Sequence, residues 1–349
     1  MRVLCILDPL ERLNFVWDTS LFLLKELFRR RHAVFVAYAG DIESENGQVL
    51  VRAREVSSIL EKEKIFRIAE PVPFALTQFD LVLIRKEPPF DETYLYLTHL
   101  LETAARQGTS LRSATCPWSV TTGRYCSRNP GQARGIFRCK VPMVNHPTGI
   151  RNANEKLAIL NFPDLIPETL VTSSGSEILK FQARLQQDIV IKPLNLMGGK
   201  DIVRIQYGAK SAASSINQAT RYGKKFIMAQ RFLQWGRKDK DKRILLLNGE
   251  VLAAFEKQPP RGEFRSNLSL GGTAHRTQLT SKEKKIVRRL KPYLLREGIY
   301  FAGVDVLCEK LIEINVTCPS GLYDATMLYP RRGLVKTWAN SLESFASYR

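Results

Sequence analysis

The first third of the chain alternates short apolar runs with amphipathic stretches. The pattern predicts strands at 3–7, 33–36 and 79–84, and helices at Trp17–Arg31 and Glu92–Arg106. Asn46-Gly47 is typical of a hairpin turn. Because strands that alternate with helices favour a parallel sheet, residues 1–109 are predicted to form an α/β domain.

Regular patterning resumes after residue 150 and continues to the end of the chain. The predicted strands are 168–171, 188–192, 202–206, 226–230, 243–247, 251–257, 304–307 and 311–314, and the predicted helices are 175–186, 280–298 and 333–346. Asn248-Gly249 predicts a second hairpin, and Thr280 with Glu283 three residues later is a capping-box pattern. Asn152 is expected to cap a short helix. Residues 258–276, rich in Gly, Pro and polar side chains, are predicted to form a long mobile loop.

Residues 110–147 interrupt both patterns. They contain six Arg and Lys residues, no acidic residue and no sustained apolar period. A segment of this kind buries little apolar surface, so we expect an insertion or linker that lies outside the folded core. The competing interpretation is a metal site of Cys116, Cys126, Cys139 and His146, although their spacings do not match the short ligand pairs of ordinary zinc sites.

Composition narrows the class of protein. The chain has 349 residues, of which 44% are hydrophobic and 25% charged, as in soluble globular proteins. No apolar run approaches the roughly 20 residues of a membrane span, and the first residues lack the apolar stretch of a signal peptide, so we expect a cytoplasmic protein without a membrane partner. The six cysteines form no CxxC pair.

Charge is the strongest compositional signal, with 53 Lys and Arg against 34 Asp and Glu, a net charge of +19. Such a balance is compatible with nucleic-acid binding or with an enzyme that acts on anionic substrates. The basic residues are spread along the chain and are not interleaved with aromatic residues as a base-stacking surface requires. The distribution therefore disfavours a nucleic-acid partner.

Two short apolar strands near the C-terminus carry a candidate metal site. Asp305 lies in the first strand, and Glu313 and Asn315 lie two residues apart in the second, hence on one face. A tight turn between the strands can bring the three side chains together. Their oxygen atoms suit Mg²⁺ held with a nucleotide phosphate. Simple exposed alternation fits less well, because the neighbouring Leu and Ile residues indicate burial, where unpaired carboxylates are costly.

A second candidate site follows a predicted buried strand that ends at Lys192. Met197, Gly198 and Gly199 come shortly after it. Glycines let the backbone approach phosphate oxygens, and a lysine supplies positive charge. The Walker pattern is absent, so a purely conformational role for the two glycines stays open.

Three arginines are candidates for binding an anionic substrate. Arg85 follows a buried strand, where the ligand crevices of open α/β sheets lie. Arg243 begins a strand, and Arg265 lies in the predicted mobile loop. Each alone is compatible with a solvated surface charge. Together with the other two candidate sites they suggest a clamp for nucleotide, metal and carboxylate substrate. No GxSxG motif or other nucleophile pattern is present.

An ordered series of motifs covers nearly the whole chain except about 110–143. The motifs are IRKEPPFD at 84–91, NEKL at 154–157, PETLVT at 167–172, IVIKPLNLMGG at 189–199, MAQRFL at 228–233, DKR at 241–243, RSNLSLGG at 265–272, GVDV at 303–306 and EINVTCPSG at 313–321. The series resembles the bacterial glutathione synthetases, which are ATP-grasp ligases. RKxPPFD together with EINVTxP makes the resemblance specific.

The resemblance implies an α+β ATP-grasp fold. An N-terminal open parallel-sheet domain at 1–109 binds substrate, and the basic insertion 110–147 separates it from a two-lobed ATP-grasp module at 148–349. The module has a lid at about 168–230 and a C-terminal lobe at about 231–349. The implied reaction joins γ-glutamylcysteine to glycine with ATP and Mg²⁺ (or Mn²⁺) through an acyl phosphate. It needs no protein nucleophile, since positioning and electrostatics suffice.

The resemblance also assigns residue roles. The ATP-binding residues would be Lys156, Lys192, Met197, Gly198, Gly199, Gln230, Arg231, Phe232 and Leu233; the metal ligands Asp305, Glu313 and Asn315; the substrate-binding residues Arg85, Asn267, Ser320 and Gly321; and the catalytic cations Arg243 and Arg265. The expected partners are the three small-molecule substrates, and a homo-oligomer is compatible with the family.

The sequence departs from the family pattern in two places. The loop that usually reads DGMGG before a small residue has Leu196 in place of its first glycine and Lys200 as the next residue. The family's Ile-Arg-Glu run is replaced by Leu-Tyr-Asp, with Tyr323 at the arginine position. Two alternatives stay open. The Tyr323 departure leaves open a related carboxylate–amine ligase with a different substrate. The net charge of +19 and the insertion at 110–147 leave open a catalytically weak homologue that acts as a basic binding protein.

Overall fold

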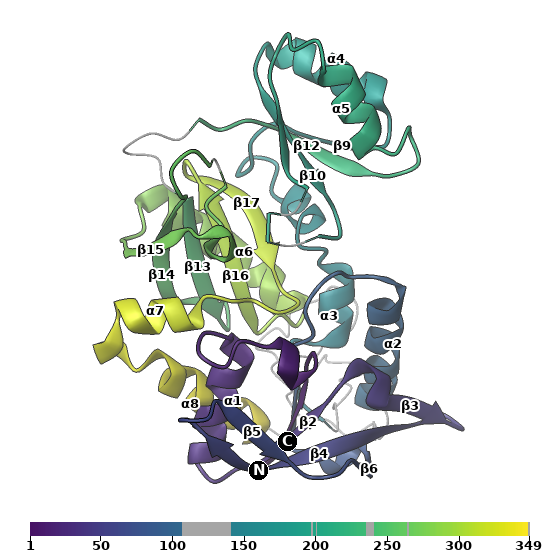
Figure 1. Cartoon of the computed structure of the whole chain (residues 1–349), viewed down its shortest axis with the longest axis vertical. Coiled ribbons are helices and arrows are strands. Elements are labelled where there is room, and N and C mark those ends of the chain that lie inside the picture. Colours follow the sequence, from purple (N-terminus) through teal and green to yellow (C-terminus); the bar gives the residue numbers. More distant parts are fainter. Residues whose placement is uncertain (107–140, 197, 200, 235–240, 264, 348–349) are drawn as a thin grey trace, which may run out of the picture.

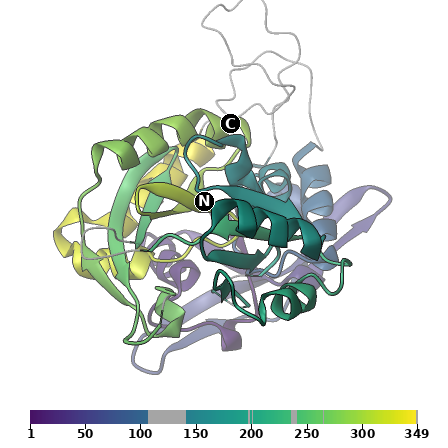
Figure 2. The same cartoon turned by 90° about the horizontal axis from the view of Figure 1, so that it is seen from above.

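The computed structural model describes residues 1–106, 141–196, 198–199, 201–234, 241–263 and 265–347. Three sheets organise this part of the chain (Figure 1). The N-terminal sheet has the strand order β3-β4-β2-β1-β7-β8, with β5 and β6 also paired to β4. A four-stranded sheet and a five-stranded sheet follow. In the view from above, the four-stranded sheet lies near the viewer and the N-terminal sheet lies far behind it (Figure 2).

The centre of the N-terminal sheet is parallel, as predicted. Its strands are β1 (Arg2–Ile6), β2 (Ala33–Ala37), β7 (Leu81–Ile84) and β8 (Met143–Val144). They are almost wholly apolar and buried, which is typical of parallel strands with covered faces. The helices in these stretches of the chain are α1 (Thr19–Arg29), α2 (Glu92–Arg106) and α3 (Pro147–Asn152). α1 begins later than predicted because the Asp18 carboxylate caps it, accepting bonds from the backbone N–H groups of Ser20 and Leu21.

One edge of the N-terminal sheet is antiparallel. It contains β3 (Ile42–Glu45), β4 (Gln48–Leu60), β5 (Ile65–Ile68) and β6 (Val72–Ala75). The predicted turn at Asn46-Gly47 joins β3 to β4, and both residues have positive φ angles, of 49° and 83°. β5 and β6 were not predicted, since their residues are mostly exposed or half-buried and lack a clear apolar period.

The four-stranded sheet has the order β11-β10-β12-β9 and is fully antiparallel. Its strands are β9 (Thr169–Thr172), β10 (Ile189–Pro193), β11 (Val203–Ile205) and β12 (Ile227–Arg231). α4 (Gly175–Leu185) and α5 (Ala212–Ala219) cover one face of it (Figure 1). The glycine-bearing segment 194–202 joins β10 to β11, as the predicted hairpin requires.

The five-stranded sheet has the order β15-β14-β13-β16-β17. Its strands are β13 (Asp241–Leu247), β14 (Glu250–Gln258), β15 (Thr273–Arg276), β16 (Phe301–Leu307) and β17 (Lys310–Asn315). The Asn248-Gly249 hairpin and the Thr280–Glu283 capping box are both confirmed, the latter at the start of α6 (Ser281–Arg296). α7 (Leu322–Leu328) and α8 (Leu334–Ser347) end the described chain.

Three local predictions were wrong. The segment 110–147 does not lie wholly outside the core, since Val141, Met143 and Val144 are buried and β8 pairs with β7. Asn152 ends helix α3 and does not cap one, because His146 is the residue at the start of that helix. The predicted loop 258–276 includes β15, which pairs with β14.

The last helix returns to the beginning of the chain. Trp338 and Leu342 of α8 share one apolar core with Leu24 of α1 and with Phe301 of the five-stranded sheet. Arg30 at the end of α1 donates a hydrogen bond to Glu343 of α8 at 2.9 Å. The N-terminal and five-stranded sheets are therefore held together by a common core.

Candidate functional site

The predicted metal ligands come together on neighbouring strands. Asp305 of β16 stands opposite Glu313 of β17, and Gly303 opposite Asn315. The amide nitrogen of Asn315 donates to the carbonyl of Gly303 at 3.0 Å and to Oδ2 of Asp305 at 3.2 Å. These two contacts engage the nitrogen and leave the amide oxygen as the atom that can coordinate a cation.

Two basic side chains contact Asp305, one of them half-buried and the other buried. Arg243 of β13 binds both carboxylate oxygens, at 2.8 and 2.9 Å, and Lys257 of β14 binds Oδ1 at 3.0 Å. Burial opposes ionisation of Asp305, but the charges of Arg243 and Lys257 outweigh it and hold the pKa of this carboxyl well below its usual range. Arg243 thus contacts one of the predicted metal ligands.

The sequence analysis missed Lys257. Its ammonium lies 3.2 Å from Oδ2 of Asp241 and 3.0 Å from Oδ1 of Asp305, and the residue is 6% exposed. Asp241 also accepts a hydrogen bond from Ser266. The Asn248-Gly249 turn was no sufficient signal, because its uninterrupted register would place Glu256 opposite Asp241. A β-bulge between Leu245 and Leu246 shifts the pairing by one residue and brings Lys257 there.

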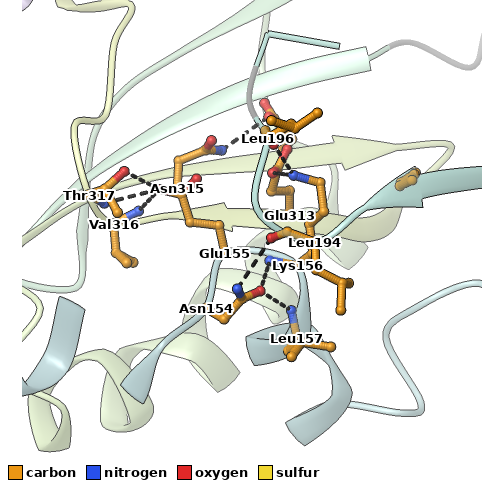
Figure 3. Close-up of polar contacts among 12 residues, drawn as sticks. Asn154, Glu155, Lys156, Leu157, Leu194, Leu196, Glu313, Asn315, Val316 and Thr317 are labelled. Atoms are coloured by element: carbon orange, nitrogen blue, oxygen red, sulfur yellow. Dashed lines mark hydrogen bonds and ion pairs between the residues drawn. The ribbon is translucent and has the colours of Figure 1, made fainter. Parts of the chain in front are cut away.

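Lys156 joins the metal candidate to the segment that follows β10. Its ammonium donates to Oε1 of Glu313 at 2.9 Å and to the carbonyl oxygen of Leu196 at 2.6 Å (Figure 3). Lys156 is buried, and its charge balances that of Glu313. The structure therefore places Lys156 beside the predicted metal ligands.

Lys192 lies near the end of β10, with its ammonium 2.6 Å from Oε1 of Gln230. The Gln230 amide nitrogen in turn donates to Oγ1 of Thr169 at 2.9 Å. Burial lowers the pKa of Lys192 to about 8, against the opposing effect of the Glu313 carboxylate. Lys192 thus lies within the electrostatic field of the same acidic cluster.

The residues after Gln230 lead out of the four-stranded sheet. Arg231 pairs with Glu168 at 3.1 Å, and the N–H of Phe232 donates to the Asp188 carbonyl at 2.9 Å. The guanidinium of Arg204 lies 4.0 Å from the centre of the Phe232 ring. Leu233 is half-buried directly after them.

The glycine-bearing segment meets the segment that carries Arg265 and Asn267. Gly198 and Gly199 have φ angles of +67° and +75°, which favour glycine. Nη1 of Arg265 donates to the Gly199 carbonyl at 3.0 Å. A Cβ atom on Gly199 would come within 2.6 Å of Oδ1 of Asn267, so close approach also requires glycine there. Met197 and Lys200 lie outside the described residues.

The substrate candidates Arg85, Ser320 and Gly321 are linked to the site through the segment 319–321. Arg85 follows β7, is 5% exposed, and donates to Oγ of Ser20 at 3.0 Å and to the Pro319 carbonyl at 2.9 Å. Nη1 of Arg243 donates to the carbonyl of Ser320 at 3.2 Å. At Gly321, with φ +103°, a Cβ atom would come within 2.8 Å of the Phe255 ring.

Among the described residues, no three His, Cys, Asp or Glu side chains gather as a metal site. A cation at Asp305 and Glu313 would therefore rely on two carboxylates and the Asn315 amide. Such hard oxygen donors fit Mg²⁺, which completes its coordination with water and phosphate oxygens. In the alternative cysteine site, Cys116, Cys126 and Cys139 lie outside the described residues, and His146 accepts a hydrogen bond from the Thr148 N–H.

Comparison with known proteins decides the family. Residues 1–114 match the model of the prokaryotic glutathione synthetase N-terminal domain, and residues 155–329 match that of the prokaryotic glutathione synthetase ATP-grasp domain. The chain belongs to the prokaryotic glutathione synthetase family. Every candidate site residue except Arg85 lies within the ATP-grasp match, and Arg85 lies within the N-terminal match.

Individual glutathione synthetases agree with this assignment over most of their length. The enzyme of Nitrosomonas europaea is 38% identical over 92% of this chain and 91% of its own. That of Gloeobacter violaceus is 34% identical over 94% of this chain and 92% of its own. The fold is the ATP-grasp fold: PsnB, an ATP-grasp ligase complexed with a minimal precursor, Mg and ADP, gives a TM-score of 0.58 at 13% identity, covering 99% of this chain and 98% of that one.

The structure shows the contacts of Leu196 and Tyr323, two residues that depart from the family pattern. Leu196 uses its carbonyl to accept the bond from Lys156, a contact that does not depend on its side chain. Tyr323, at the position where the family usually has arginine, packs edge-on against Phe22 of α1, with ring centres 5.9 Å apart. No helix in the described part of this glutathione synthetase family member is long and apolar enough to cross a membrane.

Proposed function

We propose that this chain joins γ-glutamylcysteine to glycine at the expense of ATP, forming glutathione, ADP and phosphate. The observation that carries the proposal is the convergence of Asp305 and Glu313 with buried and half-buried cations from separate strands and loops, among them Lys156, Lys192 and Arg243. Mixed charge of this kind is suited to a nucleotide triphosphate and a cation, and family membership supports the same chemistry.

The reaction would proceed in two transfers. A carboxylate oxygen of the cysteinyl residue attacks the γ-phosphorus of ATP, the bond to the β-phosphate oxygen breaks, and ADP leaves. The amine of glycine then attacks the acyl-phosphate carbon, inorganic phosphate leaves, and the amine loses a proton. No protein nucleophile takes part, so the protein would act by positioning and by stabilising charge.

Asp305, Glu313 and Asn315 would hold Mg²⁺, or Mn²⁺ in its place. When bound, the ion neutralises phosphate charge. Arg243 and Lys257 balance the charge of Asp305, and Lys156 balances that of Glu313. The same three basic side chains lie where they would neutralise phosphate oxygens of a bound nucleotide.

The remaining assigned residues would enclose the nucleotide. Lys156, Lys192 and the backbone of Met197, Gly198 and Gly199 would contact phosphates. The segment from Gln230 to Leu233 would lie beside the adenine.

Arg265 would neutralise charge during transfer, because it already contacts the glycine-bearing segment at Gly199. Arg85, Asn267, Ser320 and Gly321 would face the peptide substrate.

The domain division stays as proposed from the sequence: a substrate domain at 1–109, an ATP-grasp module at 148–349, and a lid at about 168–230 that closes over ATP. The cytoplasmic location, the homo-oligomeric state and the absence of a nucleic-acid partner are likewise predictions. Cell fractionation, light scattering and RNA-binding measurements test them in turn.

The decisive experiment measures ADP release by the purified chain with ATP, Mg²⁺, γ-glutamylcysteine and glycine. We expect ADP and glutathione in equal amounts, and no glutathione when either substrate is omitted. Turnover only with other acids or amines would indicate a carboxylate–amine ligase of different specificity. No turnover together with tight RNA binding would indicate a basic binding protein.

A further inference from the structure

Glu155, the residue before Lys156, makes a dense set of contacts that the proposed reaction does not use. Its Oε1 atom accepts hydrogen bonds from the Val316 N–H at 2.9 Å, the Thr317 N–H at 3.0 Å and the Thr317 hydroxyl at 2.7 Å (Figure 3). Its main-chain carbonyl accepts from the Ile314 N–H at 3.0 Å. Glu155 therefore fixes the chain where it leaves β17.

One neighbour of Glu155 belongs to the nucleotide side of the site. Lys156 follows directly in the chain and binds Glu313 and the Leu196 carbonyl. Asn154, the residue before Glu155, donates to the Leu194 carbonyl at 3.3 Å. A shift of Glu155 would therefore move Lys156 relative to both the metal candidate and the glycine-bearing segment.

The other neighbours lead to the peptide side. Thr317 is 4% exposed and is followed by Cys318, whose thiol donates to the Arg85 carbonyl at 3.2 Å. The guanidinium of Arg85 returns a bond to the Pro319 carbonyl at 2.9 Å. Thr317 thus directly precedes two residues, Cys318 and Pro319, that are both hydrogen-bonded to Arg85.

A buried carboxylate is an unfavourable acceptor for the hydrogen-bond donors that follow β17, because it places a negative charge near that of Glu313. Burial and the like charge of Glu313 raise the pKa of Glu155, although the bonds from Thr317 and Val316 oppose this. A neutral carbonyl or hydroxyl acceptor would avoid the second negative charge but would hold the same donors less strongly. What the carboxylate adds is strength and direction, since one charged oxygen collects three donors.

We propose that Glu155 and Thr317 form a positioning contact that couples nucleotide binding at Lys156 to the peptide side of the site at Arg85. This proposal rests on the proposed function only in taking γ-glutamylcysteine as the peptide that binds near Arg85. Any such coupling is reciprocal, so nucleotide should tighten peptide binding by the same factor as peptide tightens nucleotide binding.

The test measures the binding of γ-glutamylcysteine by calorimetry with and without a non-hydrolysable ATP analogue and Mg²⁺. The variants are Glu155→Gln, Thr317→Val, their double combination, and Thr317→Ser, which retains the hydroxyl. Glu309→Gln serves as the matched control, because it removes an exposed contact to Lys282 at the turn of the same hairpin. Thermal unfolding of each variant verifies that it is folded.

In the wild type we expect the analogue to tighten peptide binding about tenfold, within the usual range of coupling between sites. Glu155→Gln and Thr317→Val should each reduce this factor to about two or less, and the double variant should be no worse than either single one. Thr317→Ser and Glu309→Gln should behave as wild type. In the absence of peptide, each variant should bind the ATP analogue with an affinity within about threefold of the wild type, because Lys156 and Lys192 remain.

Coupling that persists in the Glu155 and Thr317 variants would overturn the proposal, as would its absence from the wild type or its equal loss in Glu309→Gln. Hydrogen exchange of the whole chain supplies a readout that needs no peptide. ADP with Mg²⁺ should slow exchange at residues 84–88 in the wild type but not in Glu155→Gln, and equal slowing in both would contradict the contact's role. Failure of the proposed function is distinguishable, since it is a lack of glutathione formation by the wild type.

Discussion

At the residue scale, Glu313 has two possible roles, since it pairs with Lys156 and also stands beside Asp305. Glu313→Gln preserves shape and removes one charge. Because a neutral amide binds Mg²⁺ weakly, we expect ligation to fall by at least about a hundredfold and the Mg²⁺ requirement to rise, while the fold survives. A magnesium titration of ADP release measures both effects. Glutathione formation at the wild-type rate would show that Glu313 is not a ligand.

Lys192 leads to a prediction about pH. Its pKa is lowered to about 8, chiefly by burial, so the ammonium of the free protein loses its proton as the pH rises through this value. The attraction for ATP phosphates should be lost in the same range. We therefore expect kcat/KM for ATP, which reports groups of the free enzyme, to decline above pH about 8.

The matched variant for this prediction is Lys192→Arg, which stays charged throughout the range. Its kcat/KM for ATP should show no such decline, whatever its absolute value. A profile for the wild type that is flat to pH 10, or an identical decline in the arginine variant, would contradict the assignment of Lys192 to the phosphates.

At the element scale, the start of α3 depends on a histidine. Nδ1 of His146 accepts from the Thr148 N–H at 3.3 Å, and burial lowers the pKa of His146 from 6.5 to about 4, against the effect of Glu102. Between these two values the unfolded chain binds the proton and the folded chain does not. The free energy of unfolding must therefore fall as the pH drops from 6.5 to 4.

His146→Asn keeps a helix-capping acceptor and removes the titration. Between pH 6.5 and 4 the free energy of unfolding of the wild type should fall by up to about 3 kcal/mol more than that of the variant. Above pH 7 the two plots of free energy against pH should be parallel. Urea unfolding at several pH values measures the difference. Curves that stay parallel down to pH 4 would show that His146 is protonated in the folded state.

Element prediction from sequence succeeded where the signal was local. Apolar runs located β1, β7 and β10, and Asn-Gly pairs located two hairpins, because turn geometry and burial depend on neighbouring residues. It failed for β8 and β15, which are short and are defined by their partners. Each is a strand only because β7 or β14 offers free backbone groups.

At the scale of the whole molecule, Asn145 joins two of the sheets. Directly after β8, its amide nitrogen donates to the carbonyls of Phe301 and Val316, both at 2.7 Å. Its oxygen accepts from the N–H groups of Tyr300 and Phe301, both at 2.8 Å. The side chain is 3% exposed, so its full hydrogen-bonding capacity is used inside the protein.

Asn145→Ala would leave four buried backbone groups without partners. We expect a loss of about 3–5 kcal/mol in the free energy of unfolding, since each unsatisfied buried group costs about 1–3 kcal/mol and part of this is recovered by water. Urea unfolding measures it. Asn161→Ala, at an exposed residue, is the control and should cost less than about 1 kcal/mol. A similar small loss for Asn145→Ala would show that the two sheets do not depend on this contact.

The sequence by itself determined the class of the fold and the family, and it predicted that Asp305 lies beside Glu313 and Asn315. The turn alone does not give that pairing, because its uninterrupted register would place Ile312 opposite Asp305. A β-bulge between Asp305 and Val306 brings Glu313 there instead. Arg85, Lys156, Lys192 and Arg243 were identified through their motifs. The motifs did not reveal which of these residues contact one another.

Only the tertiary structure decided how the charges are paired. Arg243 and Lys257 reach Asp305 because β13 lies between β14 and β16, an order set by long-range packing and not by any neighbour in the chain. The same holds for α8 against α1, and for Asn145 between β8 and β16. Contacts of this kind join residues far apart in the chain and stabilise the protein only after the sheets have packed. No local sequence pattern therefore predicts them.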